Sequence, residues 1–270
     1  MYVLGLPRSG TTILSEYLNF HFKGFNLGEW QSLTTRSYSK NGKCQCGEQF
    51  HECEFWSEIL EDLDGNQIKE LKWLRANANK LAFKKMLGLK NIRATNAISL
   101  MRNIANKAKI YSNSSMAIDS SKNPLWVYLT FDKAFDTLIY INRNPVYCLC
   151  SYLKQGISYP ITRLFNLRCL SLIPRLLLKN RTIQCSLRSF TSSPTTVLKQ
   201  INSKFFSNTF QFDSSNSNGF KRQKAHSIAG NPHRLEKGFI EIDTIMDSSP
   251  CQQMSKSTYL MLTMFNKIIS

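Results

Sequence analysis

Eight residues near the start of the chain, GLPRSGTT at 5–12, have the types and spacing of a loop that binds phosphate or sulfate. Gly5 and Gly10 permit a tight turn. Backbone N–H groups at the start of the following helix bind anions with help from the helix dipole. Arg8 adds a guanidinium that can hold two oxygens at once. The residues expected to surround the anion are Pro7, Arg8, Ser9, Gly10, Thr11 and Thr12.

One feature separates this loop from the loop of nucleoside triphosphatases. Those proteins need a lysine directly after the second glycine, and Thr11 stands at that place. A glycine-rich strand-to-helix turn that binds nothing is the alternative for such a pattern taken alone. The other polar segments of the chain favour the anion-binding interpretation.

Three polar segments follow predicted strands, at 7–12, 119–122 and 142–151. In parallel sheets, ligands bind at the carboxyl ends of the strands, so we expect the three segments to converge. The strands are predicted at 1–4, 115–124, 136–145 and 182–190, with a turn or short strand at 24–30. Helices are predicted after Thr12 and over 54–63, 68–109, 146–156 and 161–181, and a loop over 207–219.

The alternation of strands and helices predicts an α/β sandwich around a parallel sheet. The chain has 270 residues, of which 42% are hydrophobic, enough for one large core. We expect a single domain over 1–270. No internal repeat is visible.

The sequence GLPRSGTT resembles the 5′-phosphosulfate loop of sulfotransferases that use 3′-phosphoadenosine 5′-phosphosulfate (PAPS). Golgi tyrosylprotein sulfotransferases, carbohydrate sulfotransferases and many bacterial relatives carry P-R-S-G-T-T here. The resemblance implies a three-layer, P-loop-type sandwich and PAPS as co-substrate, with no required metal. It also explains the missing lysine, because the loop would hold a phosphosulfate. The resemblance spans residues 3 to about 245. Residues from about 60 to 110 and from 155 to 220 match nothing specific. The segments 31–110 and 155–220 are expected to be variable, acceptor-side insertions.

Two further stretches of the chain are similar to sequence motifs of this family. The stretch RNPVYCLCS supplies an arginine and a serine eight residues apart, Arg143 and Ser151, which the resemblance assigns to the 3′-phosphate. The stretch HSIAGNPHR resembles a late element near the nucleotide, and from it Gly230, Asn231 and Arg234 are carried over as cofactor-side residues. An acidic element common after the fourth strand is missing, since the chain reads CSLRSFTSSP there.

Sulfuryl transfer needs a general base, and it needs positively charged side chains close to the departing group, on which negative charge develops. Arg8 is the candidate for charge stabilisation, and Glu29 is the candidate base, because related enzymes place a catalytic glutamate in a comparable region. The family's aryl-type enzymes have a histidine near 119–122, and this chain has none there. Lys122 is predicted to bind the bridging or sulfuryl oxygen. Asp119 is the second candidate base, although capping of the turn is an equal alternative.

A cluster of soft ligands lies within ten residues: Cys44, Cys46, His51 and Cys53. Zinc would suit these ligands, but the spacing is not one of the usual zinc-finger forms. The stretch CQCGEQFHECEFW resembles a C-x-C-G…C-x-F-W element of bacterial relatives that requires no histidine. We favour buried free thiols over zinc, with a disulfide as a third interpretation.

The formal net charge of +17 predicts an anionic partner. The same fold also serves small-molecule kinases, but the loop lysine they need is absent. A non-catalytic nucleic-acid binder is the alternative from another class, and the three convergent motifs argue against it. We expect a carbohydrate, lipid or other small hydroxyl or amine acceptor and no specific nucleic acid.

The basic stretch 161–181 is predicted to be an amphipathic helix. It either packs on the core with its basic residues in solvent, which we favour, or it covers the acceptor or contacts a membrane surface. No signal peptide and no run of ~18 apolar residues is visible, so we expect a cytoplasmic protein.

Overall fold

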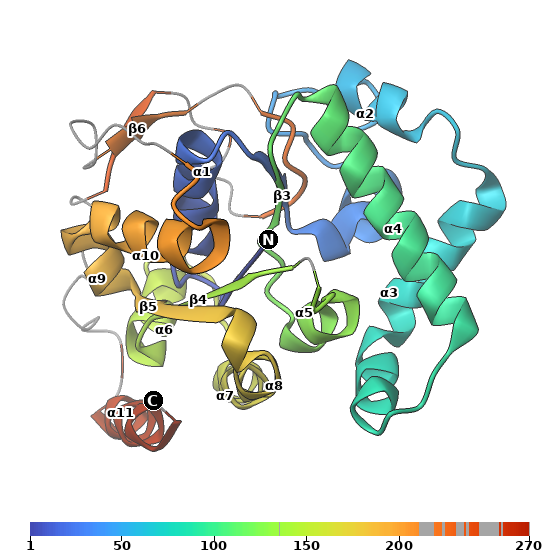
Figure 1. The fold of residues 1–270 in the computed structure, drawn as a ribbon. Helices are drawn as coiled ribbons and strands as arrows, with labels where there is room; N and C mark the ends of the chain where they lie inside the picture. Colours follow the sequence, from blue (N-terminus) through green and yellow to red (C-terminus); the bar gives the residue numbers. More distant parts are fainter. Residues whose placement is uncertain are drawn as a thin grey trace.

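The computed structural model of the protein describes residues 1–134, 136–210, 219–222, 225–230, 235, 238–242, 254 and 256–269. Five strands form a parallel sheet in the order β2-β3-β1-β4-β5 (Figure 1). The strands are β1 (Tyr2–Gly5), β2 (Phe25–Gly28), β3 (Ala117–Asp119), β4 (Leu138–Asn142) and β5 (Thr182–Ser186). This order confirms the predicted parallel sheet and makes the segment after Gly24 an edge strand.

Helices cover both faces of the sheet because successive strand residues point to opposite sides. Leu4 and Tyr140 pack into one buried cluster with residues of α3, α4 and α5. Their neighbours Val3 and Ile139 pack into a second cluster with α1, α9 and α10. Figure 1 shows these two helical layers on either side of the strands. The fold is therefore a three-layer α/β sandwich, as predicted.

The remaining elements are as follows. The α-helices are α1 (Thr11–His21), α2 (Glu54–Leu60), α3 (Gly65–Met86), α4 (Ile92–Tyr111), α5 (Pro124–Thr130), α6 (Pro145–Leu153), α7 (Ile161–Leu170), α8 (Leu172–Leu177), α9 (Leu187–Ser192), α10 (Pro194–Phe206) and α11 (Lys256–Ile269). Shorter helical turns are η1 (Trp30–Ser32), η2 (Leu33–Tyr38) and η3 (Lys179–Arg181), and a separate antiparallel pair is made by β6 (Gly219–Lys221) and β7 (Phe239–Glu241).

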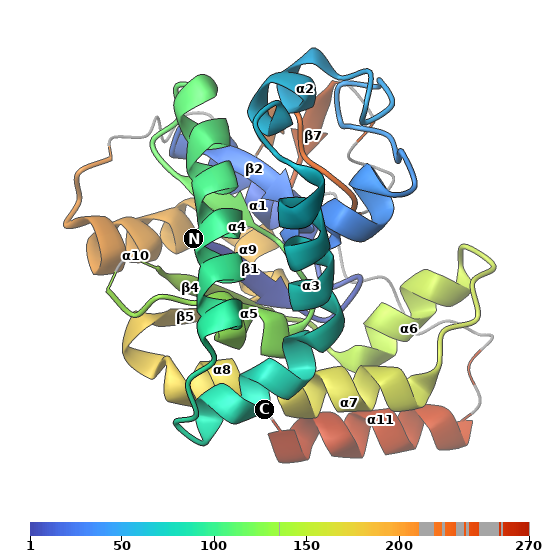
Figure 2. The same cartoon turned by 90° about the vertical axis from the view of Figure 1, so that its right-hand side faces the viewer.

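The helix predicted over 68–109 is in fact two helices, α3 and α4, which lie side by side (Figure 2). Gly88 adopts a φ of +73°, a left-handed conformation that favours glycine and commonly follows a helix end. The Asn91 side chain then caps α4 by accepting the Ala94 N–H at 2.8 Å. Both stop and start signals were present in the sequence, but the continuous run of helix formers obscured them.

The helix predicted over 161–181 is also broken, into α7, α8 and η3, and its basic residues are not all in solvent. Arg168 is buried and donates to the Tyr140 hydroxyl at 2.6 Å. Arg175 is buried as well and donates to Gln184 Oε1 at 2.7 Å. The expectation of a packed helix with solvated cations was therefore wrong for these two arginines, which bind polar groups of β4 and β5.

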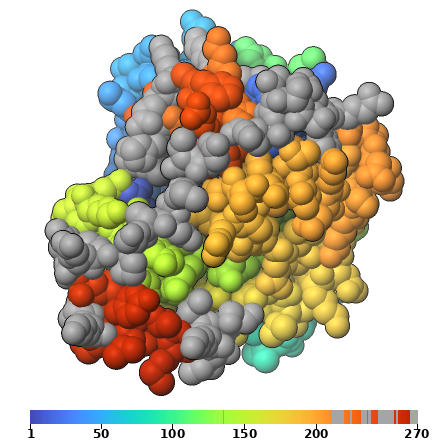
Figure 3. Space-filling view, turned by 90° about the vertical axis from the view of Figure 1, so that its left-hand side faces the viewer, coloured from blue at the N-terminus to red at the C-terminus, as the bar shows by residue number. Residues whose placement is uncertain are grey.

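The C-terminal helix α11 packs against α6, and its Leu262 is buried together with Leu164 of α7. In the space-filling view, α11 forms part of the molecular surface beside the segment that carries α6 (Figure 3). None of the described helices combines the length and apolar character needed to cross a membrane.

Candidate active site

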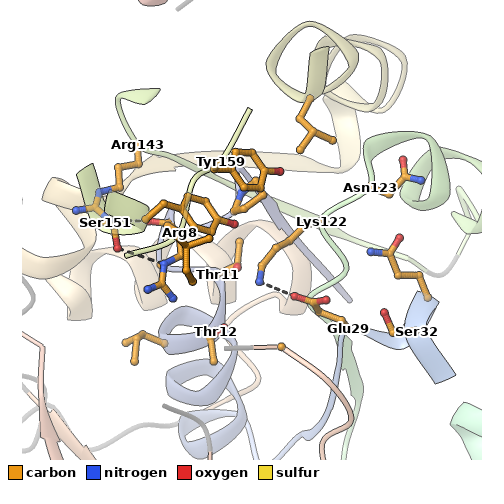
Figure 4. A pocket seen from close by; sticks show the side chains of 18 of the residues that line it. Arg8, Thr11, Thr12, Glu29, Ser32, Lys122, Asn123, Arg143, Ser151 and Tyr159 are labelled. Carbon is orange, nitrogen blue, oxygen red and sulfur yellow. Dashed lines mark hydrogen bonds and ion pairs between the residues drawn. The ribbon is translucent and has the colours of Figure 1, made fainter. Parts of the chain in front are cut away.

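A cavity of about 1020 Å³ lies where the parallel strands end, and it brings the predicted polar segments together (Figure 4). The predicted residues that line it are Pro7, Arg8, Gly10, Thr11, Thr12, Glu29, Lys122, Arg143, Ser151 and Gly230. Among the described residues, its lining contains seven lysines and arginines but two glutamates, Glu29 and Glu241. This charge balance suits a ligand with several negative charges.

The loop at 5–12 has the compact geometry that the sequence predicted. Gly5 lies so close to its surroundings that a Cβ would stand 2.7 Å from the Ile141 carbonyl oxygen. Gly10 caps α1 with a φ of 92°. The first N–H groups of an α-helix have no acceptor within the helix, and those of α1 follow Gly10 at the cavity. Ser9 differs from its neighbours: it is fully buried, does not line the cavity, and its N–H donates to Leu6 O at 3.0 Å.

Two arginines meet at this loop. Arg8 donates from Nε to Ser151 Oγ at 3.2 Å, and Arg143 donates from Nη1 to the Arg8 carbonyl at 2.6 Å (Figure 4). Arg8 has a φ of 68°, a backbone conformation that costs a non-glycine residue on the order of 1 kcal/mol, and the bond from Arg143 helps to hold it. Burial lowers the pKa of Arg8, and the nearby Arg143 charge lowers it further. An anion bound here would favour the charged form of Arg8.

Glu29 and Lys122 form an ion pair on the opposite side of the loop from Arg143 (Figure 4). Glu29 Oε1 lies 2.5 Å from Lys122 Nζ, and its other oxygen lies 3.5 Å from Arg36 Nη1. The Glu29 side chain follows β2 and is 9% exposed, whereas Lys122 follows β3, 93 residues later. The pair thus places a carboxylate and an ammonium group in the same cavity as the loop at 5–12.

Asp119, the second candidate base, does not line the cavity and is buried. Its Oδ1 accepts the Ser121 N–H at 2.7 Å and the Trp30 N–H at 3.3 Å, and its Oδ2 accepts from Trp126 Nε1. Burial raises its pKa to about 6, although the hydrogen bonds from Ser121 and Trp126 oppose this. The capping alternative therefore describes Asp119: it orders the turn before Lys122 and the start of η1.

The segment at 225–230 reaches the cavity by pairing with β2. Ile228 N–H donates to Leu27 O, and Glu29 N–H donates to Ile228 O, both at 3.0 Å. This pairing positions Gly230 in the cavity wall. Asn231 and Arg234, which were predicted to lie beside it, fall outside the described residues.

Several cavity residues were missed at the sequence level. Arg75 of α3 lines the cavity beside Arg36, and burial, with a contribution from the Arg36 charge, lowers its pKa. Tyr152 and Tyr159 stack at 4.2 Å between ring centroids, and Arg8 lies over the Tyr152 ring. Nothing in the local sequence marks Arg75, because basic residues are frequent throughout α3. The tyrosines carried a weak signal, since Tyr152 directly follows Ser151.

The cysteine cluster has a different fourth member from the one predicted. Ligand atoms of Cys44, Cys46, Cys53 and His226 lie within 4.8 Å of one another. His51 is outside this group, and its Nε2 lies 2.7 Å from the Tyr38 carbonyl oxygen. The sequence interpretation paired the cysteines with the nearest histidine along the chain, whereas the fold brings a distant histidine to them.

No protein-family model matches the sequence, and no curated protein matches it. The fold is similar to two solved sulfotransferase domains. One comes from the curacin biosynthetic pathway, with 16% identity, a TM-score of 0.53, and coverage of 98% of this chain and 96% of that one. The other comes from the Synechococcus PCC 7002 olefin synthase, with 15% identity, a TM-score of 0.55, and coverage of 99% and 92%. The chain therefore has a sulfotransferase-like fold over nearly its whole length.

Proposed function

We propose that the protein transfers a sulfuryl group from PAPS to a hydroxyl or amine of a small or glycan acceptor. The observation that carries the proposal is the meeting of Arg8, Ser151 and Arg143 at the loop, with the Glu29–Lys122 pair in the same cavity. The fold shared with sulfotransferase domains supports it. PAPS would supply the activated sulfuryl group.

The described residues fit such a donor. Its phosphosulfate would lie on the N–H groups and hydroxyls of Thr11 and Thr12, with Arg8 beside it. Its 3′-phosphate would lie near Arg143 and Ser151, within reach of charge-assisted hydrogen bonds. No lysine follows Gly10, so the loop lacks the group that binds the end of a triphosphate.

Each of the remaining residues has a definite task. Glu29 accepts the proton of the acceptor hydroxyl as the new bond to sulfur forms. Lys122 and Arg8 stabilise the negative charge that develops on the departing group. Arg36, Arg75 and Asn79 also line the cavity that contains Glu29, and we assign their wall to the acceptor. Two arginines there favour an acceptor that itself carries a carboxylate, phosphate or sulfate.

Calorimetric titration with adenosine 3′,5′-bisphosphate, the product that PAPS would leave, tests the donor. We expect binding by the wild type that exceeds binding of MgATP. In Arg143→Ala we expect the affinity to fall roughly 10- to 100-fold, the loss of one or two charge-assisted hydrogen bonds. Arg93→Ala is the matched control, because Arg93 pairs with Glu70 in solvent away from the cavity.

Equal or tighter binding of MgATP would contradict the sulfotransferase proposal and favour a kinase. Binding that is lost equally in Arg93→Ala would show that general charge, and not the cavity, holds the nucleotide. Sulfate transfer from PAPS to a panel of charged and neutral acceptors then tests the acceptor side.

A further inference from the structure

Three cysteines and one histidine from two distant segments meet beside the sheet. Cys44, Cys46 and Cys53 lie in the segment before α2, and His226 lies more than 170 residues later in sequence. Cys53 Sγ is 3.7 Å from both Cys44 Sγ and Cys46 Sγ. His226 Nδ1 is 3.2 Å from Cys53 Sγ and 3.7 Å from Cys44 Sγ.

These four separations are close to those of ligands around one tetrahedral metal ion, and all the ligand atoms lie within 4.8 Å of one another. With Zn–S bonds of about 2.3 Å and a Zn–N bond of about 2.0 Å, tetrahedral geometry separates two sulfurs by about 3.8 Å and a sulfur from the nitrogen by about 3.5 Å. A disulfide bond would need sulfurs about 2.05 Å apart. Cys44, Cys46 and Cys53 are all free thiols in the structure.

Neighbouring residues also hold the cysteine sulfurs and the imidazole in position. Backbone hydrogen bonds reach the Cys44 sulfur from Cys46 and the Cys53 sulfur from Trp56. The His226 ring is stacked on Phe55 with centroids 4.5 Å apart, and Trp56 Nε1 donates to the His226 carbonyl at 2.7 Å. Both halves of the cluster are therefore held in place by neighbours other than the four ligands.

We propose that Cys44, Cys46, Cys53 and His226 bind one Zn²⁺. Four protein ligands leave no open position for water or substrate, so the site is structural. Its effect is to fasten the segment at 225–230 to the segment at 43–57. The former segment pairs with β2 through Ile228 and carries Gly230 into the cavity. The ion therefore stabilises one wall of the candidate active site without taking part in its chemistry.

Metal analysis of the full chain, purified from a reducing cell extract without chelator, tests the proposal. We expect one zinc per chain in the wild type and loss of that zinc in His226→Ala. His51→Ala is the matched control: His51 lies next to the cluster in sequence but outside it in space, and its variant should keep the zinc. Cys169→Ser is the second control, because Cys169 is exposed and far from the cluster in sequence.

A measurement on the wild type alone covers the case in which His226→Ala does not fold. Replacing the native ion by Co²⁺ should produce the absorption bands of tetrahedral cobalt with thiolate ligands, and added Zn²⁺ should abolish them. Chelation should lower the melting temperature, and Zn²⁺ but not Mg²⁺ should restore it. These readouts are independent of sulfuryl transfer.

Three results would overturn the proposal. The first is a wild-type protein that carries no zinc and takes up neither Zn²⁺ nor Co²⁺ when reduced. The second is loss of zinc from His51→Ala with retention in His226→Ala. The third is a disulfide between Cys44 and Cys53 in the protein from the reducing extract.

Discussion

Two polar turns follow neighbouring strands of the same sheet, yet their polar side chains point to different surroundings, one set mainly to the cavity and the other mainly to the protein interior. The loop after β1 presents Arg8, Thr11 and Thr12 to the cavity. At the turn after β3, Asp119 and Ser121 point into the protein, where they accept the N–H groups of Trp30 and Gln31, whereas Lys122 and Asn123 line the cavity.

The difference shows that a polar run after a strand does not by itself identify binding residues. The loop after β1 begins a helix of 11 residues, whose amino end needs an anion or solvent. The turn after β3 instead lies against η1, whose first N–H groups need acceptors within the protein. One turn therefore presents its polar groups to the cavity, and the other positions Lys122 beside Glu29.

The largest effect on the contrast between the two turns is expected from Glu29→Gln, which removes the carboxylate beside Lys122. If Glu29 removes the acceptor proton, turnover should fall by roughly 10²- to 10⁴-fold, the usual contribution of a general base. Affinity for adenosine 3′,5′-bisphosphate should remain close to that of the wild type, because the proposal places the bisphosphate on Arg8, Arg143 and Ser151 and not on Glu29. Steady-state rates together with calorimetry separate the two effects. Glu70→Gln, which changes an exposed glutamate, should alter neither; a Glu29→Gln enzyme with normal turnover would remove Glu29 from the mechanism.

A pH series on Asp119→Asn tests the inward-facing turn. The pKa of Asp119 is raised from 3.8 to about 6 by burial, so between these values the folded protein binds more protons at this site than the unfolded chain. The contribution of Asp119 to stability is therefore complete below the lower value and is lost as pH rises through about 6. From about pH 7 to about pH 4, the wild type should gain about 2 to 3 kcal/mol relative to Asp119→Asn. Denaturant unfolding measures this difference, and parallel pH profiles would disprove it.

The smallest expected effects come from a pair of hydroxyl deletions, one in each turn. Thr12→Ala should weaken bisphosphate binding by about 1 kcal/mol and leave the free energy of unfolding nearly unchanged. Ser121→Ala should do the reverse, because it removes the acceptor of the buried Gln31 N–H and costs about 1 kcal/mol of stability or more. If both substitutions affected the same quantity, the contrast between the two turns would not hold.

Much of the candidate site could be predicted because its parts are local. The strand, loop and helix of residues 2–21 are contiguous, and glycines at 5 and 10 mark the tight turn. Proline and asparagine at the start of α6 similarly mark the helix that carries Ser151. Strands with runs of apolar residues then place these pieces at one edge of a parallel sheet.

Other parts could not be predicted because they depend on packing between distant segments. The position of Arg75 on the cavity wall depends on how α3 lies against η2 and α5. The burial of Arg168 depends on Tyr140, a polar group in a strand that reads as continuous apolar core. Neither helix carries a local feature that distinguishes these arginines from solvated ones.

The sequence by itself thus determined the fold class and the compact turn at 5–12, because periodicity, turn residues and helix starts are properties of short stretches of chain. Only the tertiary structure decided the ion pair of Glu29 with Lys122, the inward direction of Asp119, and the choice of His226 over His51 beside the cysteines. Each of these depends on which distant backbone segment supplies a partner at hydrogen-bond or ligand distance. The number of residues between two side chains in the sequence does not determine that distance. It is set only when the sheet and its two helical layers have formed.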